Sequence, residues 1–298
     1  MCPMKRYAIG VDIGGSHLTA AAVELLSGEV VPDSVAVSAL DTRAGASEIL
    51  EVWAETIGSA FRMVAGSVEG IGIAIPGPFD YGEGSSTICG VEKYDRIFGL
   101  NLTLSLVVRI SGADSCRIRY VNDASAFALG ESLGGALKGV RRGLALTLGT
   151  GLGSGFLLDG RLVTHGEGVP PEGWVYCLPY EGAIADDAFT TRWFLRRYRE
   201  LTGREATGVR EIAGEADRVP EAAAVFSDYG ERLGAFTASL CEGFPAEAVV
   251  LGGNISRAFD RFAPAMCRVL AERGCRARVS PSASPDRATL VGAASLFL

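Results

Sequence analysis

Two glycine-rich segments carry hydroxyl and carboxylate groups in an order that suits phosphate binding. In the first, Val11-Asp12-Ile13-Gly14-Gly15-Ser16, an apolar run leads an aspartate into a Gly-Gly-Ser turn, and a second apolar run follows. Glycines let the backbone approach a bulky ligand, and successive N–H groups there can form an anion-binding nest. The Ser16 hydroxyl adds a donor, and Asp12 is placed to hold Mg²⁺ through water. The alternative interpretation is an ordinary glycine-rich hairpin.

The same pattern returns about half a chain later. Residues 143–148 read as a strand, Gly149-Thr150-Gly151-Leu152-Gly153-Ser154-Gly155 as a turn, and 156–162 as the next strand. Internal repetition weighs more than a single motif. We therefore expect two lobes, each with a hairpin whose N–H groups bind phosphate, with the Thr150 hydroxyl as a further donor. Such a pair suits a nucleotide held between the lobes, whereas the alternative for this turn is a flexible hairpin tip. The P-loop and Rossmann fingerprints are both absent from the sequence.

Two further segments follow predicted strands and carry polar groups. Asn122-Asp123 comes after the strand at 116–121 and before a helix. A carboxylate at such a strand end can accept a proton from an attacking hydroxyl and align it, although an Asn-Asp helix cap is the alternative. Gly252-Gly253-Asn254 follows the strand at 248–251 and leaves room for an adenine and ribose against the backbone. A glycine pair after a strand is, however, common in α/β proteins.

Composition limits the class of protein. The 298 residues predict about two domains, and 48% hydrophobic with 21% charged residues is typical of a soluble globular chain. The net charge of −7 argues against binding to nucleic acid or a membrane surface. We find neither an apolar run long enough for a membrane span nor a signal peptide. Seven scattered cysteines indicate a reduced, cytoplasmic chain, and two histidines disfavour a histidine-rich metal site.

The elements that must position these segments alternate between strands and helices. In the first half we expect strands at 7–11, 18–23, 29–37, 70–75 and 116–121, helices at 47–66 (capped by Ser47) and 102–111, and a glycine-rich loop region at 79–99. In the second half we expect helices at 123–133, 187–202, 220–243, 256–274 (capped by Ser256) and 288–298, strands at 143–149, 155–164, 248–251 and 276–280, and an irregular stretch at 165–181.

Five ordered segments resemble the ROK family of bacterial sugar kinases, within the actin-like ATPase superfamily. They are Asp12-Ile13-Gly14-Gly15-Ser16, Ile75-Pro76-Gly77-Pro78, Asn122-Asp123-Ala124 with Ala128-Leu129-Gly130-Glu131, residues 148–155, and Val250-Leu251-Gly252-Gly253-Asn254-Ile255-Ser256. The resemblance implies an α/β fold of two actin-like (ribonuclease H-like) lobes. Each lobe is a mixed β-sheet with flanking helices, and the active-site cleft lies between them. We expect residues 1–121 with the C-terminal helix 288–298 in one lobe and 122–287 in the other.

The resemblance also implies roles for individual residues. Asp123 is the general base, Asn122 binds sugar hydroxyls, and Gly77 belongs to a loop beside the sugar. The phosphate loops are Asp12 with Gly14, Gly15 and Ser16, and Gly149 with Thr150 and Gly151, while Gly252, Gly253 and Asn254 form the adenosine loop. ATP and Mg²⁺ are the implied cofactors, with Asp12 holding the metal through water. A small-molecule sugar is the implied partner, and a homodimer is the implied assembly.

The stretch from residue 165 to 187 departs from the family pattern. Family members carry G-E-x-G-H there, then a C-x-C-G-x-x-G-C zinc site, then a glutamate. Glu172 matches the first glutamate, but no histidine follows it, and Cys177 alone cannot complete a site of about four ligands. We therefore expect no structural zinc. Glu181, Asp186 and Asp187 are candidates for the second glutamate or are merely solvated acids.

The aromatic residues near this stretch leave the sugar contacts open. Trp174 or Tyr176 could stack on a sugar in place of the histidine, or could be core residues. The polar groups of 79–84, with Lys93-Tyr94 and Phe98-Gly99, lie where the family's specificity loop falls.

The sequence supports two main hypotheses. The first is an ATP- and Mg²⁺-dependent kinase of a hexose or hexose derivative, in which positioning and charge neutralisation supply most of the catalysis. The alternative is a non-catalytic sugar- or nucleotide-binding sensor derived from such a kinase, which the missing histidine and zinc motif suggest. An actin-like chaperone or filament protein fits less well, because of the chain length and the Pro-Gly-Pro loop.

Overall fold

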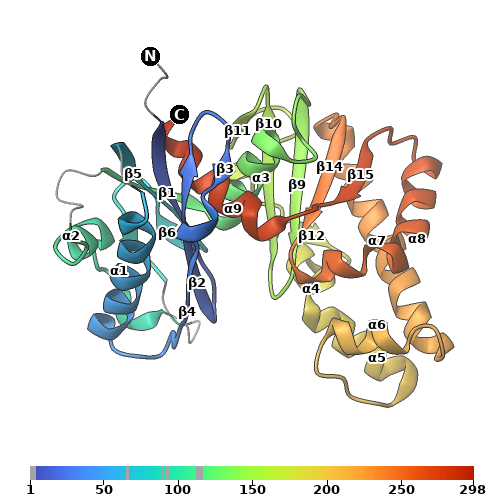
Figure 1. Cartoon of the computed structure of the whole chain (residues 1–298). Coiled ribbons are helices and arrows are strands. Elements are labelled where there is room, and N and C mark those ends of the chain that lie inside the picture. The colour runs from blue at the N-terminus through green and yellow to red at the C-terminus, as the bar shows by residue number, and fades with distance from the viewer. Residues whose placement is uncertain (1–4, 65–66, 89, 91–93, 112–116) are drawn as a thin grey trace. The chain divides into compact units, whose positions relative to one another are not determined.

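The chain folds into two compact α/β units. The computed structural model describes residues 5–64, 67–88, 90, 94–111 and 117–298. One unit comprises Met1–Gly134 with Asp286–Leu298, and the other comprises Gly135–Pro285. Each unit has its own mixed sheet flanked by helices, as Figure 1 shows, so the predicted α/β class with two lobes is confirmed.

The sheet of the first unit has the strand order β3-β2-β1-β5-β8, and β4 also pairs with β2. Its strands are β1 (Arg6–Ile13), β2 (His17–Glu24), β3 (Glu29–Val30), β4 (Ala36–Ala39), β5 (Ser67–Ile75) and β8 (Arg117–Asn122). β1 and β2 form an antiparallel hairpin, whereas β5 and β8 run parallel to β1. A short antiparallel pair, β6 (Phe79–Asp80) and β7 (Ser85–Ser86), follows β5.

Helices cover both faces of this sheet (Figure 1). They are α1 (Ala46–Arg62), α2 (Leu102–Val107), α3 (Asp123–Gly134) and α9 (Pro285–Ala294). Successive strand residues point to opposite faces, so Ile9 and Val11 pack in the cluster that contains Trp53 of α1. Gly10 faces α9, where an added Cβ would lie 2.1 Å from the Leu290 carbonyl oxygen. Only glycine allows this close approach of helix and strand.

The first boundary between the two units lies at Gly134, whereas the sequence predicted it near residue 121. α3 belongs to the first unit because it packs on α9 through two glycines. An added Cβ on Gly130 would lie 1.8 Å from the carbonyl oxygen of Ala288, and one on Gly292 would lie 1.8 Å from that of Ala126. The second boundary lies at Asp286 rather than residue 288.

The second unit has the strand order β11-β10-β9-β14-β15. These strands are β9 (Arg142–Leu148), β10 (Leu152–Leu158), β11 (Arg161–Val163), β14 (Ala248–Gly252) and β15 (Arg278–Pro281). A small hairpin, β12 (Pro179–Tyr180) with β13 (Ala183–Ile184), precedes the helices. The helices are α4 (Ala185–Ala188), α5 (Thr191–Thr202), α6 (Val209–Glu215), α7 (Pro220–Gly243) and α8 (Phe259–Glu272).

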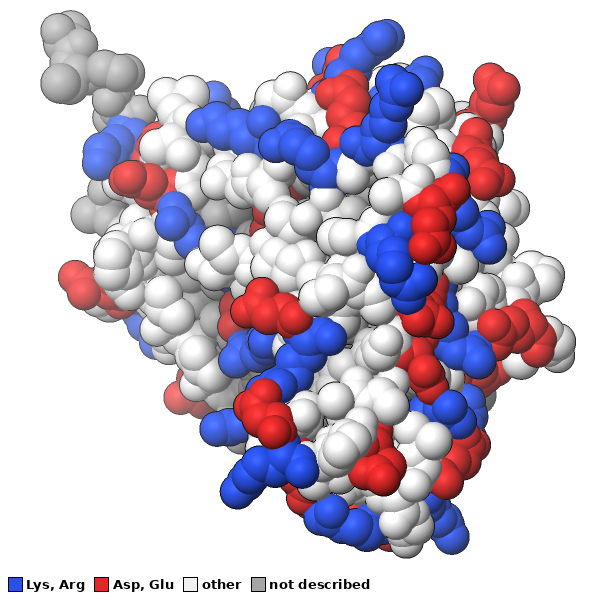
Figure 2. Space-filling view, turned by 90° about the vertical axis from the view of Figure 1, so that its right-hand side faces the viewer, with Lys and Arg blue, Asp and Glu red and all other residues white. Residues whose placement is uncertain are grey.

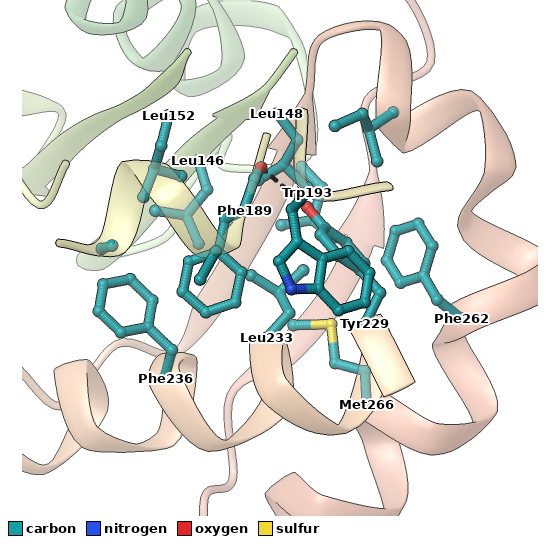
Figure 3. Packing of buried hydrophobic residues seen from close by; sticks show 14 of the residues in the cluster. Leu146, Leu148, Leu152, Phe189, Trp193, Tyr229, Leu233, Phe236, Phe262 and Met266 are labelled. Carbon is teal, nitrogen blue, oxygen red and sulfur yellow. Dashed lines mark hydrogen bonds between the residues drawn. The ribbon is translucent and has the colours of Figure 1, made fainter. Parts of the chain in front are cut away.

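An aromatic cluster fills the core of this unit. Figure 3 shows Phe189, Trp193 and Tyr229 packed together beside Leu146 and Leu148 of β9. The Tyr229 hydroxyl donates to the Phe189 carbonyl oxygen at 3.2 Å, so its buried polar group is satisfied. This cluster ties α4 and α5 to the sheet near the end of β9.

Several predicted elements differ in detail. Ser47 does not cap α1: the helix begins at Ala46 with Gly45 as its N-cap, and the Ser47 hydroxyl donates to Glu51. Ser256 does not cap α8, because a 3-10 helix (Asn254–Ala258) intervenes and the Ser256 hydroxyl donates to the Gly253 carbonyl.

Other boundaries also shift. The predicted strand 29–37 breaks where the 3-10 helix Pro32–Ser34 separates β3 from β4, because proline lacks the N–H that a ladder needs. The predicted helix 187–202 divides into α4 and α5, and α6 was not among the predicted helices. The remaining short 3-10 helices are Asp95–Ile97, Pro171–Gly173 and Ser295–Phe297. The predicted strand residue Cys116 lies outside the described residues.

Opposite charges alternate over the face in Figure 2. Arg268 of α8 pairs with Glu231 at 2.6 Å and with Glu272 at 3.3 Å, and Arg261 pairs with Asp217 at 2.6 Å. Within the described residues, no helix combines the length and the apolar composition that crossing a membrane requires.

Candidate active site

Three parallel strands of the first unit end at one edge and bring the predicted residues together. In the register of β1, β5 and β8, Asp12 lies beside Ala74, and Ile75 lies beside Asn122. Asp123 follows β8 directly and begins α3. Ligands bind characteristically at the carboxyl ends of parallel strands, so this edge is the candidate site of the first unit.

Three carboxylates lie in one electrostatic neighbourhood here. Asp12 is partly buried and shares a face of β1 with Gly10, toward α9, whose first turn carries Asp286. Burial, and then the charges of Asp123 and Asp286, raise the pKa of Asp12 to about 7. Burial also raises the pKa of Asp123. A carboxylate that is costly to ionise favours a cation beside it, which fits the expected Mg²⁺.

The first glycine turn presents free backbone donors. The Gly14 N–H donates to the His17 carbonyl at 3.0 Å, while the N–H groups of Gly15 and Ser16 have no acceptor among the described residues. The Ser16 hydroxyl and the His17 ring nitrogen Nδ1 lie 3.1 Å apart. Gly15 and Ser16 are exposed, so their donors can reach an anion.

Asn122 and Asp123 combine a cap with a free donor. Asn122 Oδ1 accepts from the N–H groups of Ala124 at 3.0 Å and Ser125 at 3.2 Å, and Asp123 Oδ1 accepts from Ala124 at 2.9 Å. The cap geometry considered as an alternative is therefore present. It fixes the direction of both side chains, and the Asn122 amide also donates to the Asp123 carboxylate.

Gly77 lies next to a tyrosine that contacts Asn122. The Tyr81 hydroxyl donates to the Ile75 carbonyl at 3.2 Å and accepts from Asn122 Nδ2 at 3.3 Å. An added Cβ on Gly77 would lie 3.4 Å from the same hydroxyl. The Gly77–Pro78 peptide bond is cis. Gly77 and Asn122 thus share one polar neighbour.

The second glycine turn joins β9 to β10 and is held by side chains of α4 and α5. The Leu152 N–H donates to Asp186 Oδ1 at 2.7 Å, and Thr191 donates to the Gly149 carbonyl through its N–H at 2.9 Å and its hydroxyl at 3.2 Å. The N–H groups of Thr150 and Gly151 have no acceptor within the part of the chain that the structure describes. Asp186, expected as a sugar contact or a solvated acid, instead supports this turn.

The glycine pair after β14 packs on the end of β9. Gly253 has φ +78°, and an added Cβ would lie 2.4 Å from the Leu148 carbonyl oxygen. Gly252 is paired with Thr147 in the parallel register of β14 and β9. Within the second unit, Gly252, Gly253 and Asn254 therefore lie beside the turn at Gly149.

Hydrogen bonds anchor the irregular stretch. The buried Ser154 hydroxyl donates to the Gly173 carbonyl at 2.6 Å and accepts from the Val175 N–H at 3.1 Å. Glu172, in the 3-10 turn between Pro170 and Trp174, is exposed with φ 57°.

Glu181, Asp187 and Tyr176 of this stretch are exposed. Glu181 forms an ion pair with Arg232 of α7. Trp174 and Tyr176 pack on each other with ring centroids 6.0 Å apart; Trp174 is half-buried and Tyr176 is 40% exposed.

Residues 8–298 match the sequence profile described as the ROK family. The chain belongs to the ROK family. It is 27% identical to the N-acetyl-D-glucosamine kinase of Haemophilus influenzae over 97% of this chain and 98% of that protein. Two solved structures have a similar fold. The ROK hexokinase of Thermus thermophilus is 24% identical, with TM-score 0.77 and 97% of each chain covered. The ROK glucokinase of Streptomyces griseus, in complex with glucose and AMPPNP, is 23% identical, with TM-score 0.74 and coverage of 97% and 98%.

This ROK chain gathers its predicted residues in two groups. The first unit brings together Asp12, the turn 14–16, Gly77, Asn122 and Asp123, and the second brings together 149–151 and 252–254. Neither Glu172 nor Glu181 has a hydrogen bond or ion pair, among the described residues, with a member of these two groups. Among the described residues, no cluster of three or more His, Cys, Asp or Glu side chains is arranged to hold a metal ion.

Two residues that support the site, Asp286 and Tyr94, were not predicted in that role. Asp286 could have been found, since Pro285-Asp286 before an apolar run is a helix-start signal. Tyr94 was expected on the sugar side, but it is buried and its hydroxyl donates to the Gly14 carbonyl at 2.5 Å. Lys93 lies outside the described residues.

Proposed function

We propose that this chain transfers the γ-phosphoryl group of Mg²⁺·ATP to a hydroxyl of a hexose or hexose derivative. The observation that carries the proposal is the placement of Asp12, the open donors of Gly15 and Ser16, and Asp123 at one edge of the parallel strands β1, β5 and β8. Family membership and the N-acetyl-D-glucosamine kinase relative support the same reaction class.

Each unit offers groups that fit part of a nucleotide. The free N–H groups at Gly15, Ser16, Thr150 and Gly151 fit the phosphate oxygens. The adenosine would lie against the backbone of Gly252 and Gly253, as the resemblance to the family implies. Asp12 would hold Mg²⁺ through water, since its charge is otherwise uncompensated among carboxylates. The metal, when bound, neutralises charge on the phosphates.

Asp123 would accept the proton of the attacking hydroxyl. The cap on α3 fixes its carboxylate, and burial raises its pKa, which makes it a stronger base than an exposed aspartate. Asn122 would donate to a sugar hydroxyl beside it. Glu172 remains the candidate sugar-binding acid. Glu181 fits less well because Arg232 already pairs with its carboxylate, and the Trp174–Tyr176 pair offers exposed ring surface to a sugar face.

The test is a panel assay on the whole chain. ADP release with Mg²⁺·ATP is measured with glucose, mannose, fructose, N-acetylglucosamine and N-acetylmannosamine, and mass spectrometry identifies a product heavier by one phosphoryl group. The proposal expects sugar-dependent ADP release for at least one of them. Sugar- or ATP-induced stabilisation without turnover across the panel would instead support the sensor. The homodimer and the cytoplasmic location stay predictions.

A further inference from the structure

Tyr94 lies at the contact between three segments of the first unit. Its hydroxyl donates to the Gly14 carbonyl at 2.5 Å, its N–H donates to the Thr42 carbonyl at 2.9 Å, and its ring packs edge-on against Trp53 at 5.7 Å. Only 2% of Tyr94 is exposed, and its backbone has φ 61°. A non-glycine residue held in the left-handed region carries strain, which the surrounding contacts must offset.

The Tyr94 hydrogen bond sets the direction of a phosphate-binding donor. The Gly14 carbonyl and the Gly15 N–H belong to one planar peptide unit. In a trans peptide these two groups point in opposite directions. Because Tyr94 holds the carbonyl, the Gly15 N–H points away from Tyr94, where the described residues offer it no acceptor. Tyr94 therefore aims the donor that the nucleotide would use.

Tyr81 performs a similar task on the Asn122 side chain. A side-chain amide has two N–H donors and one oxygen with two acceptor positions. The oxygen of Asn122 already accepts from Ala124 and Ser125, and one N–H donates to the Tyr81 hydroxyl at 3.3 Å. The Tyr81 hydroxyl in turn donates to the Ile75 carbonyl at 3.2 Å. The Asn122 side chain also donates to the Asp123 carboxylate, so Tyr81 sets the orientation of an amide that lies against the proposed base.

We propose that Tyr94 and Tyr81 are positioning residues with separate tasks, Tyr94 for the phosphoryl donor and Tyr81 for the acceptor hydroxyl. This inference rests on the proposed kinase function. Neither hydroxyl contacts the reacting atoms: Tyr94 acts through the Gly14–Gly15 peptide, and Tyr81 acts through the Asn122 amide.

The test compares Tyr94→Phe with Tyr81→Phe in the full chain. Tyr120→Phe is the matched control, because Tyr120 is a tyrosine of the same unit, 7% exposed, whose hydroxyl accepts from Thr103. KM for ATP, KM for the sugar and kcat are measured for each variant with the best substrate of the panel. Calorimetric titration with the non-hydrolysable analogue AMPPNP gives the nucleotide affinity independently of turnover.

The expected result is a double dissociation. Tyr94→Phe raises KM for ATP and weakens AMPPNP binding about tenfold, which is the size of effect expected when one hydrogen bond is removed. KM for the sugar stays within about twofold of wild type. Tyr81→Phe raises KM for the sugar about tenfold and leaves AMPPNP affinity within about twofold. Tyr120→Phe changes none of these constants beyond about twofold, as expected for a buried tyrosine hydroxyl outside the site.

Three outcomes would overturn the inference while leaving the kinase function standing. Unchanged constants in an active Tyr94→Phe or Tyr81→Phe enzyme would show that the hydroxyls position nothing. Equal effects of each variant on both substrates would show a general structural role. A general structural role would also follow if Tyr94→Phe or Tyr81→Phe melted well below Tyr120→Phe and if both KM values, kcat and AMPPNP affinity all worsened together. A wild-type chain that phosphorylates no sugar would instead refute the proposed function.

Discussion

Replacing Asp12 by asparagine should stabilise the free protein while removing its metal-dependent activity. Asparagine has nearly the shape of aspartate but carries no charge. In the wild type, burial, Asp123 and Asp286 raise the pKa of Asp12 from 3.8 to about 7. The folded state therefore holds a proton on Asp12 where the unfolded chain has already lost it.

The size and sign of the effect follow from this shift. Below about pH 4 Asp12 is protonated in both states and costs nothing. As the pH rises from 3.8 to about 7, wild-type stability falls by about 1.4 kcal/mol per pH unit, because the folded state binds more protons. Above pH 7 the full penalty is reached, with an upper limit of about 4 kcal/mol from the 3.8-to-7 shift. Asp12→Asn avoids this penalty.

The assay is urea denaturation of wild type and Asp12→Asn at pH 4.5, 6 and 8 without nucleotide or Mg²⁺. The free-energy difference should be small at pH 4.5 and grow to its maximum at pH 8. Asp33→Asn is the control, because Asp33 is an exposed aspartate of the same unit and its variant should follow wild type at each pH. A pH-independent difference, or a variant less stable than wild type at pH 8, would refute the electrostatic reasoning.

Two further substitutions test the second unit. Gly253→Ala should lower stability by about 2 kcal/mol more than the control Gly274→Ala and weaken ATP binding: both glycines have positive φ, +78° and +72°, but only the first would bring Cβ within 2.4 Å of Leu148. Equal urea midpoints would contradict this. Asp186→Ala removes the acceptor of the Leu152 N–H and should raise KM for ATP about three- to tenfold by loosening the turn, whereas Asp217→Ala, which removes an exposed ion pair, should leave KM unchanged. Matching KM values in the two variants would show that the turn does not depend on Asp186.

The sequence predicted those parts of the site that local patterns determine. Asp12, the turn 14–16 and Asn122-Asp123 were placed correctly relative to their strands, because an apolar run followed by glycine or a helix-capping residue marks a strand end. Parallel pairing of β1, β5 and β8 then brings these strand ends to one edge. The family resemblance supplied the chemistry that the spacing alone left open.

Long-range side-chain contacts could not be predicted in the same way. Tyr94 contacts Gly14 across 80 residues, Asp186 contacts Leu152 across 34, and Arg232 contacts Glu181 across 51. No local pattern marks these pairs, because each depends on how separate elements pack. The same limit explains the boundary at Gly134, which is set by glycine contacts between α3 and α9 rather than by any linker.

Asp123→Asn tests the central claim most directly. The variant keeps an oxygen that can accept the Ala124 N–H but loses the base, so ATP affinity should stay near wild type while sugar-dependent ADP release falls at least about a hundredfold. AMPPNP titration and the sugar panel measured on the same preparation give both quantities. Turnover at the wild-type rate would contradict the assignment of Asp123 as the general base.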